Sequence, residues 1–254
     1  MILFTETFDD ILIESAKSDK YEKDVATSIN KIAGVTAERP KVSTAYSDVL
    51  LTLDGGEKTW LEVKMNHTDN LSNPRIFFDG KKWDTTYHTS AAAKAVSIMN
   101  KSNEAKDFLK AIAKYSGIEN PTIPTTKRGL KEDTAVPLFL MKEYFDQPGL
   151  NRYITTVPDV DLGKVVTDHY TTGKAEPAYY MQAGDDFYML TTTNPFNLPK
   201  DIPVLKGKGA FKVRIATRSE FYEVQAEIKI TTLAPSKYSL KPGTKKKNPF
   251  KGIS

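Results

Sequence analysis

The sequence predicts an α/β protein in which helices flank a central mixed β-sheet and the C-terminal half is rich in strands. Two apolar runs, residues 48–53 and 58–65, are joined by Asp54-Gly55-Gly56 and have apolar residues on both faces, as expected for a sheet that is covered on each side. A helical repeat precedes these runs and another follows them. Strand-like segments then dominate from residue 153 onward.

The composition indicates a soluble globular protein. A chain of 254 residues with 39% hydrophobic content can build one elaborate domain, which we expect over residues 1–234. The absence of cysteine excludes disulfides and thiolate zinc sites, so a cytoplasmic location is expected. Acidic residues in the first ten positions argue against an export signal, and no run reaches the roughly 18 apolar residues of a membrane helix.

The first helix is predicted over residues 20–33 and should end at Gly34. Its apolar residues recur at helical spacing: Tyr21, Val25, Ile29 and Ile32. Glu22 lies at the margin of this stripe, so its side chain can face inward. Asp19 and Asp24 are close enough in sequence to compete with Glu22 for such a position.

The next two runs predict a β-hairpin whose alignment decides its chemistry. A two-residue Gly-Gly turn would leave Asp48 and Glu62 on opposite faces of the sheet. A three-residue turn, with Gly56 in the left-handed conformation, would instead pair Asp48 with Glu62. Asp48, Glu62 and Lys64 would then project from one face, because alternate side chains of a strand share a side.

Less regular segments follow the hairpin. Residues 66–89 are polar and aromatic and predict an irregular loop, and a long helix is expected over 90–115, closed by Gly117. Residues 138–145 form either a short helix or a strand. The C-terminal half contains five predicted strands: 153–157, 178–182, 187–192, 210–217 and 221–230.

Positive charge is concentrated near the C-terminus. The net charge of +4 arises there, because seven lysines and no acids lie between Ile228 and Ser254. Residues 235–254 therefore predict a flexible basic tail. The stretch 200–218 is also basic, and we expect it to contact nucleic-acid phosphates through four residues: Lys206, Lys208, Lys212 and Arg214.

Asp48 is followed, after thirteen residues, by Glu62-Val63-Lys64, a spacing that resembles the motif of the PD-(D/E)xK nuclease superfamily. Members of this superfamily include restriction endonucleases, phage nucleases and Holliday-junction resolvases. Ser47 stands where the name of the motif has proline. The resemblance covers about residues 20–115 and implies a restriction-endonuclease-like catalytic core, with a β-rich elaboration over about 150–232.

Two carboxylates and a lysine suit phosphodiester hydrolysis with Mg²⁺, which prefers hard oxygen ligands; Mn²⁺ can substitute. Asp48 and Glu62 are the expected ligands, and the resemblance adds the Val63 carbonyl. Lys64 would stabilise the pentavalent phosphate or orient the attacking water. Glu22 would hold a further water or a second ion. The alternative is an ordinary cross-strand ion pair, worth about 0–1 kcal/mol at a surface.

The sequence therefore predicts a Mg²⁺-dependent DNA endonuclease of restriction or phage type. The resemblance further implies a homodimer, because members of the superfamily often cut two strands with two sites, and a location in the cytoplasm of a bacterium or of a phage-infected cell. Two alternatives remain open. One is a structure-selective junction resolvase. The other is a non-catalytic module that keeps a degenerate nuclease fold and binds nucleic acid or a protein.

Overall fold

The computed structural model describes residues 8–40, 46–66, 70–150, 152–161 and 163–252. The chain folds into two compact units. The first unit comprises Met1–Asp69, Tyr170–Lys206 and Leu233–Ser254, and the second comprises Asn70–His169 and Gly207–Thr232. The single domain expected over 1–234 is thus distributed over both units, and each unit contains segments that are far apart in sequence.

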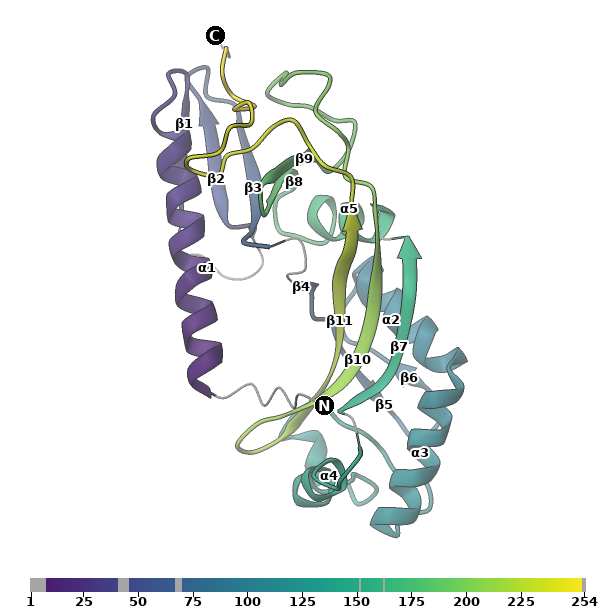
Figure 1. The fold of residues 1–254 in the computed structure, drawn as a ribbon. Coiled ribbons are helices and arrows are strands. Elements are labelled where there is room, and N and C mark those ends of the chain that lie inside the picture. Colours follow the sequence, from purple (N-terminus) through teal and green to yellow (C-terminus); the bar gives the residue numbers. More distant parts are fainter. Residues whose placement is uncertain (1–7, 41–45, 67–69, 151, 162, 253–254) are drawn as a thin grey trace. The chain divides into compact units, whose positions relative to one another are not determined.

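The first unit is built on a five-stranded mixed sheet (Figure 1). Its strands are β1 (Val35–Glu38), β2 (Val49–Leu53), β3 (Lys58–Lys64), β8 (Ala178–Ala183) and β9 (Asp186–Met189), in the order β1-β2-β3-β8-β9. β3 and β8 run parallel, whereas the other neighbours are antiparallel. This parallel pair joins two parts of the chain that are more than 100 residues apart.

The turn between β2 and β3 has the three-residue form. The Leu53 N–H donates to the Glu57 carbonyl at 2.9 Å, and Gly56 has a φ of 87°. Val49 pairs with Leu61 and Leu50 with Trp60. Continuing this register places Asp48 opposite Glu62, which confirms the second of the two predicted alignments.

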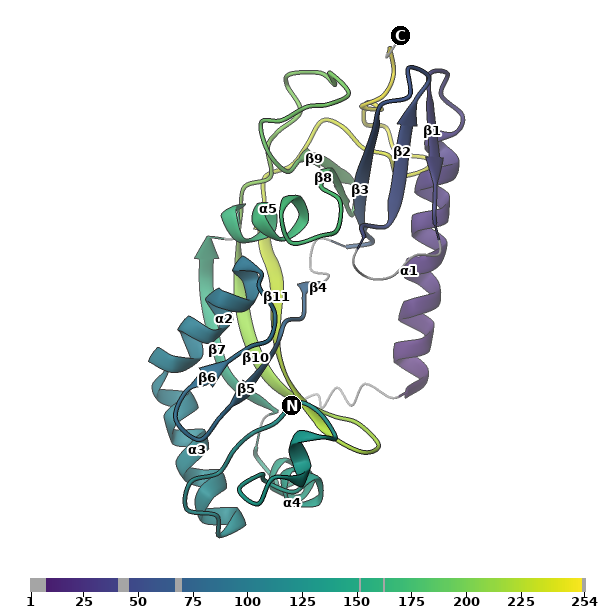
Figure 2. The same cartoon turned by 180° about the vertical axis from the view of Figure 1, so that it is seen from behind.

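Helix α1 (Phe8–Ile29) covers one face of this sheet, as both ribbon views show (Figures 1 and 2). The helix begins and ends earlier than the predicted range of 20–33. Its buried residues Val25 and Ile29 belong to one core cluster with four sheet residues: Val49, Leu51, Leu61 and Val63. The apolar stripe therefore packs on the sheet, and Glu22, at the margin of the stripe, forms an ion pair with Arg39, the residue that follows β1.

The expectation of a flexible tail over 235–254 is wrong for its described residues. Phe250 is fully buried and Leu240 is 1% exposed, and both belong to the core cluster of the first unit. Lys246 donates to the Asp186 carboxylate at 2.7 Å. The prediction relied on the basic composition of the segment and overlooked three apolar residues that pack in the core: Tyr238, Leu240 and Phe250.

The second unit contains a six-stranded antiparallel sheet in the order β6-β5-β11-β10-β7, with β4 paired to β11. Its strands are β4 (Asn70–Ser72), β5 (Arg75–Phe78), β6 (Trp83–Asp84), β7 (Tyr153–Asp161), β10 (Gly207–Thr217) and β11 (Tyr222–Leu233). The irregular loop predicted over 66–89 thus contains three short strands. Sequence patterns missed them because each is only two to four residues long.

Helices α2 (Ser90–Lys101), α3 (Asn103–Ser116) and α4 (Leu138–Phe145) complete the second unit, with a short 3₁₀ turn at Gly129–Lys131. The long helix predicted over 90–115 is interrupted at Ser102. This residue has extended backbone angles, and its hydroxyl accepts from the Ala105 N–H, so it caps α3. Gly117 closes α3 in the left-handed conformation, as predicted.

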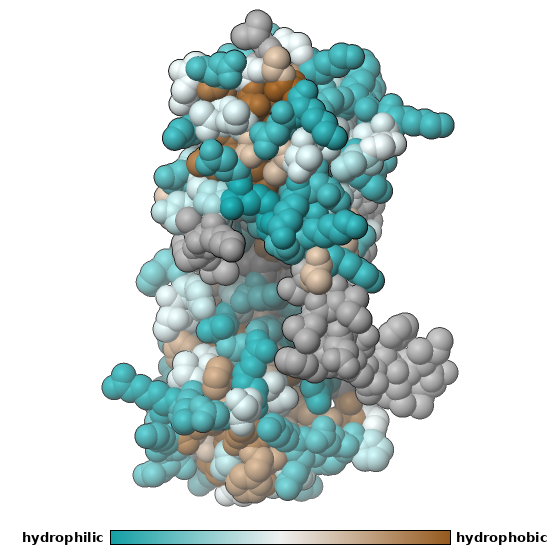
Figure 3. All heavy atoms as spheres, turned by 90° about the vertical axis from the view of Figure 1, so that its left-hand side faces the viewer, coloured by the Kyte–Doolittle hydropathy of each residue, from teal (hydrophilic) through white to brown (hydrophobic). Residues whose placement is uncertain are grey.

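Helix α5 (Gly163–Thr171) leads from the second unit back to the first, which begins again at Tyr170. None of the helices in the described ranges is both long and apolar enough to cross a membrane. The surface seen from the α1 side is mainly hydrophilic and carries only small apolar patches (Figure 3).

Candidate active site

The hairpin brings the predicted triad together within the first unit. Asp48 directly precedes β2, and its Oδ2 accepts a hydrogen bond from the Val63 N–H at 2.9 Å. Lys64 Nζ lies 2.5 Å from Glu62 Oε1. The side chain of Glu62 is 4% exposed and that of Lys64 is 20% exposed, so this ion pair is largely removed from water.

Glu22 reaches the same region from α1. It forms an ion pair with Arg39, which also pairs with Asp19 at 2.9 Å. Its negative charge nevertheless contributes to the raised pKa of Asp48. Glu22 is therefore the acid of α1 that influences the triad, although its carboxylate is engaged by Arg39.

Two residues that sequence reasoning missed complete the cluster, both from the chain that returns from the second unit. Tyr170, at the end of α5, is buried, and the negative charge of Glu62 acts on it. Lys174 Nζ donates to the Tyr46 carbonyl at 3.2 Å and lies 5.6 Å from the centroid of the Tyr170 ring. The pairing of β3 with β8 brings these two residues to the triad. Because this contact joins distant parts of the sequence, no local sequence pattern could have predicted it.

Burial and mutual charge give the two carboxyl groups opposite pKa shifts. Burial, together with the negative charges of Glu62 and Glu22, raises the pKa of Asp48 to about 7, against the opposing effects of Lys64 and the Val63 N–H. Burial also opposes ionisation of Glu62, but Lys64 and Lys174 hold its pKa below the ordinary value. Although burial disfavours a charged Lys64, Glu62 raises the pKa of that lysine well above its usual range.

These shifts describe a buried carboxyl group, Glu62, beside a half-buried one, Asp48, which cannot both ionise freely. The lowered pKa of Glu62 and the raised pKa of Lys64 favour their charged forms, whereas the raised pKa of Asp48 favours its protonated form. A divalent cation between the two carboxylates would relieve their repulsion and displace the proton from Asp48. The electrostatics of the cluster therefore suit a cation.

The donor set can be compared with what Mg²⁺ requires. Within the described ranges, no group of three His, Cys, Asp or Glu side chains is arranged to hold a metal ion. Asp48 and Glu62 supply two carboxylates. Glu62 Oε2 is buried, and Lys64 pairs with the other oxygen, Oε1. Mg²⁺ is commonly held by one or two carboxylates and retains several waters, so these residues fit it.

The predicted DNA-binding residues do not belong to this cluster. Lys208, Lys212 and Arg214 lie on β10 in the second unit, and Lys206 is the last residue of a segment of the first. Arg214 Nε lies 2.6 Å from the carboxylate of Glu227, which is 3% exposed. Lys212 Nζ lies 5.4 Å from the centroid of the Tyr153 ring. Arg214 is thus partly committed to a structural ion pair.

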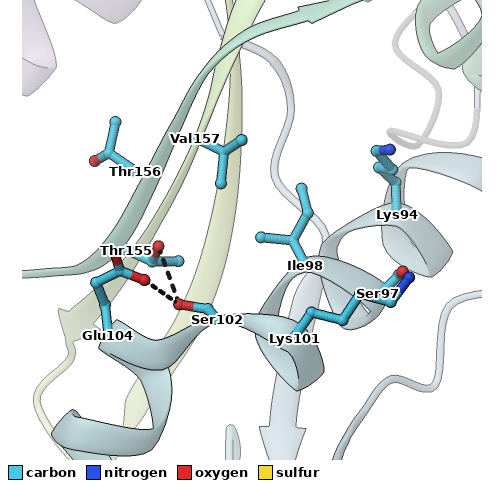
Figure 4. A pocket seen from close by; sticks show the side chains of 9 residues that line it. All are labelled: Lys94, Ser97, Ile98, Lys101, Ser102, Glu104, Thr155, Thr156 and Val157. Atoms are coloured by element: carbon cyan, nitrogen blue, oxygen red, sulfur yellow. Dashed lines mark hydrogen bonds between the residues drawn. The ribbon is translucent and has the colours of Figure 1, made fainter.

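A separate pocket of about 300 Å³ lies in the second unit, between the α2–α3 junction and β7 (Figure 4). Ser102 is at its centre and makes hydrogen bonds with Glu104 at 2.7 Å and Thr155 at 3.3 Å. Lys94 and Lys101 lie at its rim and are exposed. Ser102 caps α3, and the pocket lining contains a single carboxylate, Glu104, so it offers no counterpart to the paired carboxylates of the first unit.

Comparison of the chain with protein-family models, with curated proteins and with solved structures finds no match. The geometry of the Asp48–Glu62–Lys64 cluster and the topology around it are therefore the features that point to a function.

Proposed function

We propose that this protein is a Mg²⁺-dependent endonuclease that hydrolyses phosphodiester bonds of DNA at the Asp48–Glu62–Lys64 cluster. The observation that supports this most directly is the register of the β2–β3 hairpin, which sets Asp48 opposite Glu62. Two carboxylates and a lysine on one face of a buried hairpin are the groups that metal-assisted phosphodiester hydrolysis requires.

The topology of the first unit supports the resemblance to restriction-endonuclease-like cores. The unit has an acid-bearing helix, a strand that opens after Asp48 and a neighbouring strand that ends with Glu62-Val63-Lys64. A mixed sheet carries these strands, with β8 parallel to β3. The helices at 90–116, which the resemblance was expected to include, belong to the second unit.

Asp48 and Glu62, with the Val63 carbonyl, would hold the Mg²⁺. Bound there, the ion would supply positive charge to the phosphate and lower the pKa of a water molecule. Glu62 Oε2 is the ligand atom best prepared for this role, because it is buried and Lys64 pairs with the other oxygen of the carboxylate, Oε1. Glu22 would accept hydrogen bonds from nearby water while Arg39 fixes its side chain.

Lys64 would stabilise the charge that develops on the phosphorus oxygens. Its ammonium is held by Glu62 at 2.5 Å and remains protonated over the physiological range, because the neighbouring carboxylate raises its pKa. A protonated lysine cannot serve as the general base. We therefore assign to it charge stabilisation and orientation of the phosphate rather than proton abstraction.

Plasmid cleavage tests the proposal. The wild-type chain should nick or linearise supercoiled DNA with Mg²⁺ or Mn²⁺ and should be inactive in EDTA. Asp48→Asn and Glu62→Gln should each reduce the rate at least about 100-fold, the scale of losing one charge-stabilising group. Glu104→Gln, at an exposed acid of the second unit, is the matched control. Retained cutting by either cluster variant, beyond that of a mock preparation, would reject the site.

The same assay separates the related functions. Preferential cleavage of a four-way junction over a linear duplex would identify a junction resolvase, and binding without metal-dependent turnover would identify a non-catalytic module. We include a homodimer in the proposal, since two sites are needed to cut both strands together. The molecular mass of the free and DNA-bound protein, measured by light scattering, tests that part.

The second unit would add DNA contacts through β10. Lys208 and Lys212 are the informative positions to replace, because Arg214 is paired with the buried Glu227 and its loss would destabilise the fold. The Lys208→Ala and Lys212→Ala double variant should weaken DNA binding and reduce its salt dependence by about two ion equivalents. An unchanged salt dependence would remove β10 from the DNA interface.

A further inference from the structure

The segment between α5 and β8 carries Lys174, a second cation at the candidate active site. It is brought to the start of β2 by the hydrogen bond from its Nζ to the Tyr46 carbonyl, across 128 positions of sequence. The Tyr170 ring lies beside the same ammonium at 5.6 Å. These contacts come from two different segments, so the position of Lys174 is defined by the tertiary structure of the first unit.

Lys174 acts on the same carboxylate as Lys64. The positive charges of both lysines stabilise ionised Glu62, and Lys64 is the stronger of the two. Lys64 already forms the close ion pair with Glu62, at 2.5 Å. A second lysine is therefore not required to satisfy the carboxylate, and its presence needs another physical reason.

The charge of the whole cluster provides that reason. Asp48 and Glu62 balance Lys64 and Lys174, so the four groups are close to neutral when all are ionised. A divalent cation held by the two carboxylates would leave the cluster with a positive surplus. Such a surplus suits an anionic ligand, and Lys174 is half-buried, with its ammonium beside the Tyr170 ring and the Tyr46 carbonyl.

We propose that Lys174 is a second phosphate-binding residue of this site, which contacts the backbone of the nucleic-acid substrate in the ground state while Lys64 acts on the phosphate that is cleaved. This inference rests on the proposed nuclease function and assigns a substrate contact within it. Lys174 would set the affinity for the substrate, whereas Lys64 would set the rate of the chemical step.

A structural clamp is the competing explanation. Lys174 could simply fasten residues 172–177 to the start of β2 through the Tyr46 carbonyl. The two roles differ in what they predict. A clamp stabilises the fold and leaves binding unchanged, whereas a phosphate contact contributes about one ion equivalent to the salt dependence of DNA binding.

The test measures binding of a short fluorescein-labelled DNA duplex by anisotropy with Ca²⁺ in place of Mg²⁺, so that a cation with the same preference for oxygen ligands is available to the site, and a gel checks that the duplex stays intact. Lys174→Met should weaken binding about tenfold and lower the salt slope by about one, as expected for loss of one charged contact. Lys174→Arg, which keeps the charge, should restore most of the affinity. Lys58→Met is the matched control, because Lys58 is an exposed lysine at the far end of β3.

Steady-state cleavage with Mg²⁺ then gives a second readout. Lys174→Met should raise KM with a smaller change in kcat, whereas Lys64→Met should lower kcat. The inference is overturned if Lys174→Met has the same affinity and salt slope as Lys58→Met. If the wild-type protein cuts DNA in that case, the nuclease proposal still stands. A lower melting temperature with an unchanged salt slope also overturns the inference, in favour of the clamp.

A wild-type protein that binds the duplex but never cuts it would instead reject the nuclease function. In that case the loss of affinity in Lys174→Met would still support the phosphate contact.

Discussion

The carboxylate of Asp48 accepts a 2.9 Å hydrogen bond from the backbone N–H of Val63, the residue between Glu62 and Lys64. One bond thus ties the start of β2 to the end of β3 and holds Asp48 beside the Glu62–Lys64 ion pair. The same contact keeps an ionisable group in a largely buried position, where it titrates far from its ordinary range. The proposed metal binding and the proposed chemistry both depend on this arrangement.

The raised pKa of Asp48 predicts an unusual pH dependence of stability. Folded Asp48 keeps its proton until about pH 7, whereas the unfolded chain releases it near about pH 4. The folded state therefore binds more protons between these values, and the free energy of unfolding should fall as the pH rises from about 4 to about 7. Asp48→Asn should remove this slope and be more stable than the wild type at pH 8, by at least about 1 kcal/mol.

Urea unfolding across that pH range measures this effect. Asp54→Asn, at an exposed aspartate in the neighbouring turn, is the control and should keep the wild-type slope. Parallel pH profiles for the wild type and Asp48→Asn would show that Asp48 is not protonated in the folded protein.

Mg²⁺ should stabilise the folded protein, and more strongly at high pH. The ion and the proton compete for Asp48, so the rise in melting temperature with millimolar Mg²⁺ should be larger at pH 8 than at pH 5.5. Glu62→Gln should abolish most of the rise. Sodium chloride at matched ionic strength controls for screening, and an equal response of wild type and variant to Mg²⁺ would argue against a site at these residues.

The β2–β3 turn offers a direct test of what sets the register. Gly56 has a φ of 87°, which an L-residue adopts at a cost of about 1–2 kcal/mol, so Gly56→Ala should destabilise the fold by about that amount. Gly55→Ala is the matched control, because no atom lies within 4 Å of an added Cβ there. Equal unfolding free energies for the two variants would contradict the three-residue turn.

Phe250 tests whether the C-terminal segment is part of the core. Its ring is fully buried and lies within 6.5 Å of the rings of Tyr180, Phe187 and Phe196. Phe250→Ala should lower the free energy of unfolding by about 3–5 kcal/mol. Lys251→Ala, at the exposed neighbouring position, should change it by less than about 0.5 kcal/mol. No loss of stability in Phe250→Ala would restore the flexible tail.

Local patterns predicted well those features that depend on neighbouring residues. The hairpin follows from turn chemistry, and the left-handed Gly56 with the shared face of Asp48, Glu62 and Lys64 belongs to one of the two alignments that turn chemistry and the two-residue period of a strand allow. Local patterns failed where a segment has a weak local signal and is held by strong tertiary contacts. Short strands at 70–84 carry too few residues to show a period, and the lysine-rich C-terminal segment is held by a few buried aromatic and aliphatic side chains.

The sequence by itself determined the residues of the triad and reduced their alignment to two possibilities, because all three lie within one hairpin of about 20 residues, where backbone geometry leaves few alternatives. The structure decided between the two alignments, since Leu53 bonds to Glu57 across a three-residue turn. The tertiary structure decided which other residues join the triad. Tyr170 and Lys174 reach it because β8 pairs in parallel with β3, and Glu22 does so because the apolar stripe of α1 orients the helix on the sheet. Such contacts depend on long-range packing, which no local pattern encodes.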